Sequence, residues 1–313
     1  MKKNLLALYC ALIFAPLLMP AQAQDCGDDS PCPQPRYITH AKLTFNDGSE
    51  YDGGFKDGRY NGQGVFRYAD GNVFEGQYQA GKRNGHGQLT YDGNTFVGNY
   101  QNGKRHGIGK LTYRSGDVFE GQYENNQRNG VGTLTYQSGD EFVGHYQNDK
   151  RNGNGTFTYK NGDKFVGNYQ DGKRQGQGKL TYANGNAFEG QYQDGHRVNG
   201  TLTYTSGDRY TGEFADGNYH GQGTFTYHSG DKYEGQFRNG RFDGKGVFTY
   251  KNGDQYAGDY QAGLPHGQGT FTYKNGDKYE GGYVKGVRQG EGVFTFASGQ
   301  VRKGVWENGE LKP

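Results

Sequence analysis

Aromatic and polar residues alternate in short segments along most of this chain. The segment YEGQF at 233–237 is typical: on a strand, its two aromatic residues and its glycine fall on one face, and its Glu and Gln fall on the other. In the following segment, VFTY at 247–250, the Phe and the Tyr again share a face. The pattern therefore predicts pairs of β-strands, each with one aromatic face.

This pair of segments recurs at a fixed interval. Most copies are 23 residues long and two are 22, and a degenerate last copy begins near Arg302. The aromatic residues that open the copies are Tyr51, Phe74, Phe96, Phe119, Phe142, Phe165, Phe188, Tyr210, Tyr233, Tyr256 and Tyr279. A period of this size is typical of one supersecondary unit that is stacked many times.

The turn Lys251–Gly253 decides whether neighbouring strands share their aromatic face. A two-residue Asn-Gly loop would pair Thr249 with Tyr256 and split the aromatic residues between faces. A three-residue loop with Gly253 in the left-handed conformation pairs Phe248 with Tyr256 and keeps them together. We therefore expect the three-residue loop here.

The 22-residue copy that begins at Phe74 tests this interpretation. There a two-residue Asp92-Gly93 loop pairs Leu89 with Phe96 and again unites the aromatic face. The other connection within each repeat, such as residues 81–87 (GKRNGHG), is rich in glycine and reads as a longer loop.

These patterns predict an all-β fold. We expect an extended antiparallel β-hairpin repeat array, a single-layer curled sheet resembling a solenoid, with about 11 repeats of 22–23 residues. Two strands per repeat give roughly 22 to 24 strands and a length of roughly 110 Å.

A single sheet leaves its aromatic face without a second layer. Either the rings cover one another in a tightly curled groove, or a partner covers them. The residues expected on this face are represented by Phe119, Tyr123, Phe142, Tyr146, Phe165, Tyr169, Tyr233, Phe237, Phe248, Tyr250, Tyr256 and Tyr260.

The repeat Y-x-G-x-[FY]-x-x-G-x-x-x-G-x-G-x-[FL]-x-Y-x-[ND]-G, as found at 233–253 and in its neighbours, resembles the membrane occupation and recognition nexus (MORN) repeat. The resemblance covers about 270 of the 313 residues. It implies a non-catalytic hairpin array that contacts proteins or membrane phospholipids and often self-associates. We therefore assign residues 39–313 to a MORN-repeat array.

Residues 1–23 read as a secretory signal peptide. Lys2 and Lys3 precede an apolar run, and Ala21-Gln22-Ala23 forms the cleavage site. The alternative is a retained membrane anchor, for which the run is short. The leader has a bacterial character, so we expect an exported bacterial protein that is periplasmic or secreted.

A linker containing proline and cysteine is expected at residues 24–38. After cleavage it retains Cys26 and Cys32, which we expect to form a disulfide in an oxidising compartment.

Charge is nearly balanced. The chain has 35 Lys and Arg against 33 Asp and Glu, and removing Lys2 and Lys3 with the leader leaves 33 of each. This balance argues against nucleic acid as a partner, because nucleic-acid binding needs an excess of positive charge. A basic stripe nevertheless follows equivalent positions of the N-terminal repeats, at Lys82, Arg83, Lys104, Arg105, Arg128, Lys150, Arg151, Lys173 and Arg174. It is either solvated loop charge or a site for phosphate groups or an acidic partner.

No arrangement typical of an enzyme was found in the sequence. The matches to G-x-x-x-x-G-K, such as residues 98–104, lie on a strand and turn and lack the following Ser or Thr. Histidines at equivalent positions lie whole repeats apart, which separates them too far to share a metal. We expect no catalytic residues, no cofactor and no metal site.

The function favoured by these observations is a non-enzymatic binding scaffold of the cell envelope that acts through protein–protein contact or self-association. The first alternative is binding of phospholipid or lipopolysaccharide headgroups through the basic stripe, which salt would weaken. A further alternative is glycan binding, although Trp306 is the only tryptophan available to stack on sugars.

Overall fold

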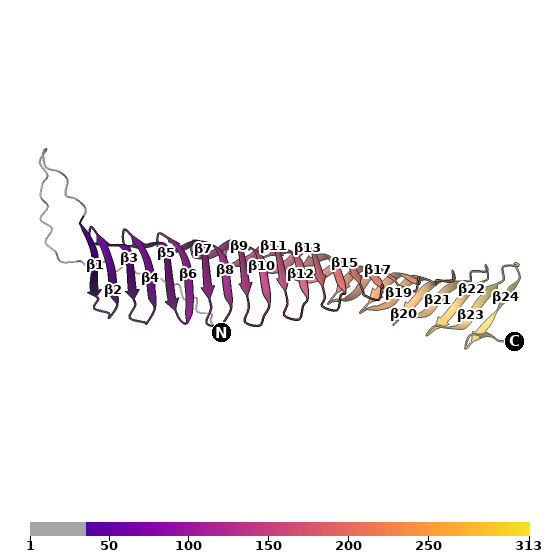
Figure 1. Cartoon of the computed structure of the whole chain (residues 1–313). Coiled ribbons are helices and arrows are strands. Elements are labelled where there is room, and N and C mark those ends of the chain that lie inside the picture. Colours follow the sequence, from indigo (N-terminus) through magenta and orange to yellow (C-terminus); the bar gives the residue numbers. More distant parts are fainter. Residues whose placement is uncertain (1–35) are drawn as a thin grey trace, which may run out of the picture.

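The computed structural model describes residues 36–313. This part of the chain forms one sheet of 25 strands, and each strand pairs antiparallel with its neighbours in the chain. The strands follow one another in chain order along an elongated array that twists along its length (Figure 1). The predicted all-β hairpin array is therefore confirmed.

The strands have the following bounds: β1 Tyr37–Thr44, β2 Glu50–Lys56, β3 Arg59–Arg67, β4 Val73–Gln79, β5 Lys82–Tyr91, β6 Asn94–Gln101, β7 Lys104–Thr112, β8 Val118–Glu124, β9 Gln127–Thr135, β10 Glu141–Gln147, β11 Lys150–Thr158, β12 Lys164–Gln170, β13 Lys173–Thr181, β14 Ala187–Gln193, β15 His196–Thr203, β16 Arg209–Ala215, β17 Asn218–Thr226, β18 Lys232–Arg238, β19 Arg241–Thr249, β20 Gln255–Gln261, β21 Leu264–Thr272, β22 Lys278–Val284, β23 Val287–Thr295, β24 Val301–Glu307 and β25 Glu310–Leu311.

The three-residue turn is confirmed between β19 and β20. Phe248 lies opposite Tyr256, Gly253 has a φ of 96°, and its N–H donates to the carbonyl of Tyr250 at 2.9 Å. These are the features of a type I turn followed by a glycine bulge. The two-residue turn of the short copy is also confirmed, because Leu89 pairs with Phe96.

The glycine-rich connection differs from the expectation. Residues 82–91 form strand β5, and the connection from β4 is the two-residue turn Ala80-Gly81, in which both residues have positive φ. The glycines of this stretch belong to a bulge in the strand, since Gly76 pairs with Gly87 but Tyr78 already pairs with Arg83. The expectation of a longer loop at 81–87 was therefore wrong.

In several repeats, a side chain from the opposite strand satisfies the backbone of the bulge. In the copy that begins at Tyr233, the Oε1 of Gln236 accepts the backbone N–H of Lys245 at 2.9 Å. Gln122 does the same for Val131 at 2.8 Å. The bulge thus leaves no unpaired donor at this point, which is the condition for keeping it within a sheet.

The core is a single row of interlocked rings. The opening aromatics are almost fully buried, and Tyr233 contacts Phe237 and Tyr260 edge to face with centroids 5.1 Å apart in both cases. Each ring lies over two cross-strand glycines: a Cβ at Gly246 would lie 2.3 Å from the hydroxyl oxygen of Tyr233. Bare backbone therefore takes the place of the missing second layer.

Within the described residues, no helix is long and apolar enough to cross a membrane. The expected signal peptide at 1–23, Cys26 and Cys32 lie outside the described residues. Strand β1 begins at Tyr37, inside the segment expected to be a linker.

Candidate binding groove

Most of the aromatic residues expected to meet a partner are occupied by the core. Those with almost no exposed surface are Phe119, Tyr123, Phe142, Tyr146, Phe165, Tyr169, Tyr233, Phe237, Tyr256 and Tyr260. Of the expected set, Phe248 is partly buried and Tyr250 is 38% exposed. The rings cover one another within one chain, which is the first of the two arrangements considered for this face.

Two rows of half-exposed side chains lie above these core rings. The first, here called the cover row, is the tenth residue of each repeat: Tyr60, Arg83, Arg105, Arg128, Arg151, Arg174, Arg197, Tyr219, Phe242, Pro265 and Arg288. The second, the tyrosine row, is Tyr68, Tyr91, Tyr113, Tyr136, Tyr159, Tyr182, Tyr204, Tyr227, Tyr250 and Tyr273. The hollows between these two rows form the groove described below.

Every aromatic ring and every guanidinium of the cover row lies on the opening ring of its own repeat. The guanidinium carbon of Arg174 is 4.2 Å from the ring centroid of Phe165, and that of Arg151 is 4.6 Å from Phe142. Where the row is aromatic, the contact becomes ring stacking: Phe242 stacks on Tyr233 at 3.7 Å with an interplanar angle of 11°. A planar group therefore covers the core ring in both cases.

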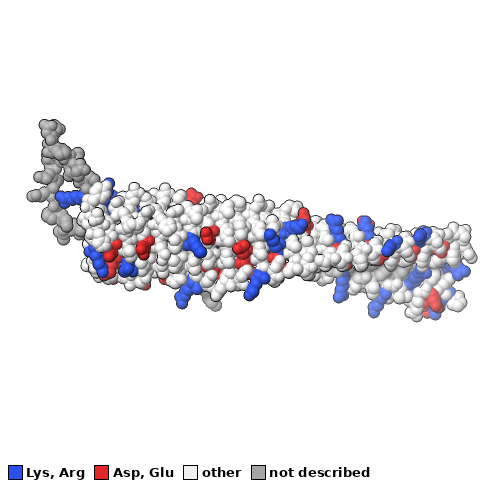
Figure 2. Space-filling view, viewed as in Figure 1, with Lys and Arg blue, Asp and Glu red and all other residues white. Residues whose placement is uncertain are grey.

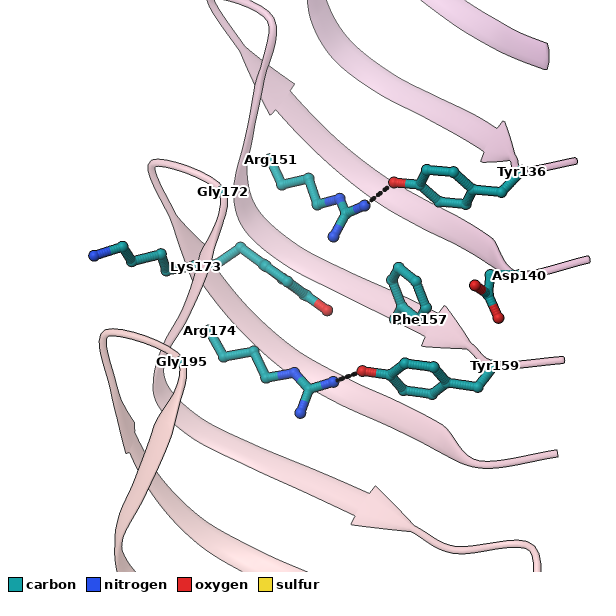
Figure 3. A pocket seen from close by; sticks show the side chains of 10 residues that line it. Tyr136, Asp140, Arg151, Phe157, Tyr159, Gly172, Lys173, Arg174 and Gly195 are labelled. Atoms are coloured by element: carbon teal, nitrogen blue, oxygen red, sulfur yellow. Dashed lines mark hydrogen bonds between the residues drawn. The ribbon is translucent and has the colours of Figure 1, made fainter. Parts of the chain in front are cut away.

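Arginines of the cover row also bind the tyrosine row of the preceding repeat. Arg151 donates to the hydroxyl of Tyr136 and Arg174 to that of Tyr159, as Figure 3 shows. Arg197 donates to Tyr182 at 3.0 Å. The same pairs are Arg83 with Tyr68 and Arg288 with Tyr273. Each such pair, here called a rung, crosses the groove and joins two repeats.

The hollow between two rungs is open and of moderate size. The hollow has a volume of about 450 Å³ and is lined by Tyr136, Arg151, Tyr159, Tyr169 and Arg174. Figure 3 shows it from close by. A second hollow of about 230 Å³ lies further along the array, where the cover row holds Tyr219 and Phe242. The groove is thus cationic in its N-terminal part and aromatic at Tyr219 and Phe242.

Buried tyrosine hydroxyls lie below the cationic part of the groove. Within the described residues, the hydroxyls of Tyr146, Tyr169 and Tyr192 are buried without a hydrogen-bond partner. Burial raises the pKa of Tyr146 to about 12, against the opposing influence of Arg128 and Arg151. These hydroxyls are neutral at any ordinary pH and are closed off from the groove by the residues above them.

The predicted basic stripe is split by the structure. Its lysines, Lys82, Lys104, Lys150 and Lys173, are exposed at the two-residue turns. Lys150 pairs with Asp171 and Lys173 with Asp194, both at 3.1 Å. Basic and acidic side chains are interspersed along the face seen in Figure 2.

The arginines of the stripe lie in the groove instead. Arg83, Arg105, Arg151 and Arg174 form no ion pair within residues 36–313, whereas Arg128 pairs with Asp149 at 3.3 Å. The sequence did not reveal this division. One sequence signal could have revealed it: Tyr219 and Phe242 stand at the repeat position that holds Arg in other copies. Arg, Tyr and Phe share a planar side-chain group, which indicates stacking on a ring.

The acids of the three-residue turns have a structural role. Asp140 accepts the backbone N–H of Lys160 in the next repeat at 2.8 Å and the hydroxyl of Ser138 at 2.9 Å. The backbone bond, followed by the hydroxyl, holds the pKa of this carboxyl below its usual value. Equivalent backbone bonds are made by Asp117, Asp163, Asp208, Asp231, Asp254 and Asp277. Within residues 36–313, no group of His, Cys, Asp and Glu has the number and arrangement to hold a metal ion.

A family model described as the MORN repeat matches eleven consecutive segments. They are residues 51–73, 74–95, 96–118, 119–141, 142–164, 165–187, 188–209, 210–232, 233–255, 256–278 and 279–301. Every segment starts at one of the opening aromatics. No curated protein matches the chain.

Solved structures with extended similarity include a TCP10 domain of CPAP from Danio rerio. It is 8% identical, and the match covers 85% of this chain and 100% of that chain with a TM-score of 0.20. A virginiamycin B lyase from Staphylococcus aureus is 12% identical, with 86% and 97% covered and a TM-score of 0.14. With TM-scores this far below 0.5, neither bears on the function of this chain.

Proposed function

Because the chain belongs to the MORN-repeat family, whose repeats generally serve binding and scaffolding, we propose that it is a non-enzymatic scaffold that holds an extended protein partner along its groove. The observation that carries the proposal is the recurrence of the same two half-exposed rows in successive repeats. The core rings below them are already covered by this chain, so the rows are the part of the aromatic face that is left for a partner.

The proposed place of action is the cell envelope, in the periplasm or outside the cell. This part of the proposal rests on the leader-like sequence of residues 1–23 alone. Headgroup binding through basic residues is less well supported, because the exposed lysines Lys150 and Lys173 already pair with Asp171 and Asp194. Each pair is neutral overall, so the exposed part of the stripe has little net positive charge to attract an anionic membrane surface.

Site-specific photocrosslinking in cells tests the proposal. A photoreactive phenylalanine analogue is placed at Tyr159, in the groove, and in a second strain at Val166, which is 48% exposed on the opposite face of the sheet. We expect a discrete protein adduct from Tyr159 and none from Val166. Adducts from Val166 alone, or lipid adducts from both positions, would contradict the proposal.

A further inference from the structure

The arginine part of the groove has a charge and a spacing that select one kind of occupant. Resting on the proposed function, we infer that the cover-row arginines from Arg83 to Arg197, apart from Arg128 with its partner Asp149, bind an acidic, proline-containing segment of a partner protein in the polyproline II conformation. One carboxylate of that segment meets one arginine per repeat.

The charge of the site comes from arginines that lack an acidic partner. Within residues 36–313, Arg151 and Arg174 each donate to one tyrosine hydroxyl and form no ion pair. A guanidinium has five N–H donors in a planar fork that matches a carboxylate. The remaining donors of these arginines therefore suit a carboxylate that lies in the hollow between two rungs.

The spacing of the rungs favours one backbone conformation. Two strands per repeat place equivalent arginines about 9.6 Å apart along the sheet. A polyproline II helix rises about 3.1 Å per residue with three residues per turn, so every third side chain returns to the same face after about 9.3 Å. An α-helix needs about 6.4 residues for the same distance, which is not a whole number of turns.

The walls of the groove also suit such a segment. Tyr136 and Tyr159 present half-exposed rings, and proline-rich helices dock between aromatic side chains. A polyproline II backbone makes no internal hydrogen bonds, so its carbonyl groups need donors. The hollow is open, so water can reach and solvate these carbonyl groups.

The array changes its preference towards the C-terminus. Tyr219, Phe242 and Pro265 replace arginine in three successive repeats, and the hollow at Tyr219 is lined mainly by rings. No guanidinium of the cover row is available there. The acidic stretch of the partner therefore lies over the N-terminal repeats, which fixes its register along the array.

Two synthetic peptides test the spacing directly. One is (Glu-Pro-Pro)₆, and the other repeats Glu-Pro-Glu-Pro-Pro-Pro three times, with the same length and composition. In the second peptide half of the glutamates fall out of phase with the arginines. We expect the purified protein to bind the first peptide about tenfold more tightly in fluorescence anisotropy, because about three carboxylates of the second lose their partners.

Two double variants test whether the arginines or the adjacent lysines bind the peptide. Arg151→Tyr with Arg174→Tyr removes two guanidinium groups but keeps a planar cover on the core ring, as Tyr219 does in the native chain. Lys150→Gln with Lys173→Gln removes the same charge from the adjacent exposed positions. We expect the tyrosine variant to bind the first peptide more weakly and with a smaller preference over the second, and the glutamine variant to keep both, with unchanged circular dichroism in both.

Equal affinity for the two peptides would overturn the inference, as would equal losses in the two variants, which would indicate non-specific charge attraction. If Tyr159 crosslinks to a protein while the peptides bind equally, the proposed scaffold stands and the polyproline II segment does not. If no protein adduct forms and the peptides also bind equally, both fall.

Discussion

At the scale of single residues, the glycines that face each other across neighbouring strands determine how a one-layer sheet can have a core. Gly121 and Gly132 lie opposite each other, and the ring of Phe119 rests on both. Any side chain here would push the ring off the sheet and expose the row of rings beneath the groove. Glycine is required at these two positions because it has no Cβ, and its backbone flexibility matters less.

This role predicts a difference between two chemically identical substitutions. In Gly121→Ala the new Cβ would lie 2.5 Å from the Cα of Gly132 and 2.8 Å from the ring of Phe119. Gly304 has the same repeat position, but Arg302 replaces the opening aromatic there, and the Cβ would meet only Leu311 Cδ1 at 2.7 Å. We expect a loss of about 2 kcal/mol for Gly121→Ala from the free energy of unfolding in urea, and clearly less for Gly304→Ala. Equal losses at the two positions would show that ring contact is not the cause.

The stacking of the arginines on the core rings could not be predicted from the sequence. Arg151 and Lys150 are adjacent and both basic, and as a sequence pattern they form one stripe. Alternation along β11 sends Lys150 to the solvent and Arg151 over the ring of Phe142, 4.6 Å away. Whether a guanidinium is free or stacked depends on which ring lies beneath it, and this follows only from the strand register.

At the scale of strands and turns, the two connections of the repeat have separate tasks. The three-residue turns carry an acid that joins each repeat to the next through a backbone hydrogen bond, as Asp231 does with Lys251 at 2.8 Å. The two-residue turns point the exposed lysines outward and begin the bulged strands. The first kind of turn therefore stabilises the array, and the second orients the cover row.

The turn acids predict a loss of stability in acid. Backbone hydrogen bonds lower the pKa of Asp140, Asp208 and Asp231 in the folded protein. Their contribution is present above the unfolded pKa of about 3.9 and is lost as the pH falls through the lower folded values. Asn94 occupies the same turn position and makes the same bond to Arg114. We expect the triple Asp→Asn variant to retain its circular dichroism to a lower pH than the native chain; identical acid unfolding curves would rule out this linkage.

A different turn controls how many arginines are available in the groove. Asp149 stands where most two-residue turns have glycine, with a φ of 66°, and it holds Arg128 by an ion pair and a backbone bond. Asp149→Gly relieves strain of about 1 kcal/mol and removes a partly exposed ion pair worth about as much. We expect little change in stability but tighter binding of (Glu-Pro-Pro)₆ as Arg128 becomes free. Unchanged affinity in anisotropy would show that this arginine does not face the peptide.

The strands were predictable because two independent signals agreed. Alternation required Phe248 and Tyr256 on one face, and a turn ending in Gly253 offered the one loop length that places them there. At residues 82–87 the signals conflicted, because an unbroken run of polar residues and glycines reads as a loop. The bulge that accommodates them is stabilised by Gln77, whose side chain accepts the N–H of His86 at 3.2 Å, and such a long-range bond leaves no trace in local sequence.

At the scale of the whole molecule, the array is long and thin, and every repeat packs only on its neighbours (Figure 1). Stability in such a stack is a sum of repeat and interface contributions. The tyrosines of the core recur in nearly every copy. A change that affects their hydroxyls therefore acts on all repeats together.

Alkaline titration is such a change. Burial raises the pKa of Tyr146, Tyr192 and Tyr283 to about 12, while an unfolded tyrosine ionises near 10. Their stabilisation is complete below pH 10 and is lost as the pH rises towards 12, because the unfolded chain gives up these protons first. Three such groups alone remove about 4 kcal/mol per pH unit, and neighbouring repeats add more. We expect the absorbance of tyrosinate at 295 nm and the loss of β-sheet circular dichroism to rise together in one steep step between pH 10 and 12. Ionisation of most tyrosines near pH 10 with the sheet intact would show that the rings are open to solvent, and that the groove rests on a looser core than the one described.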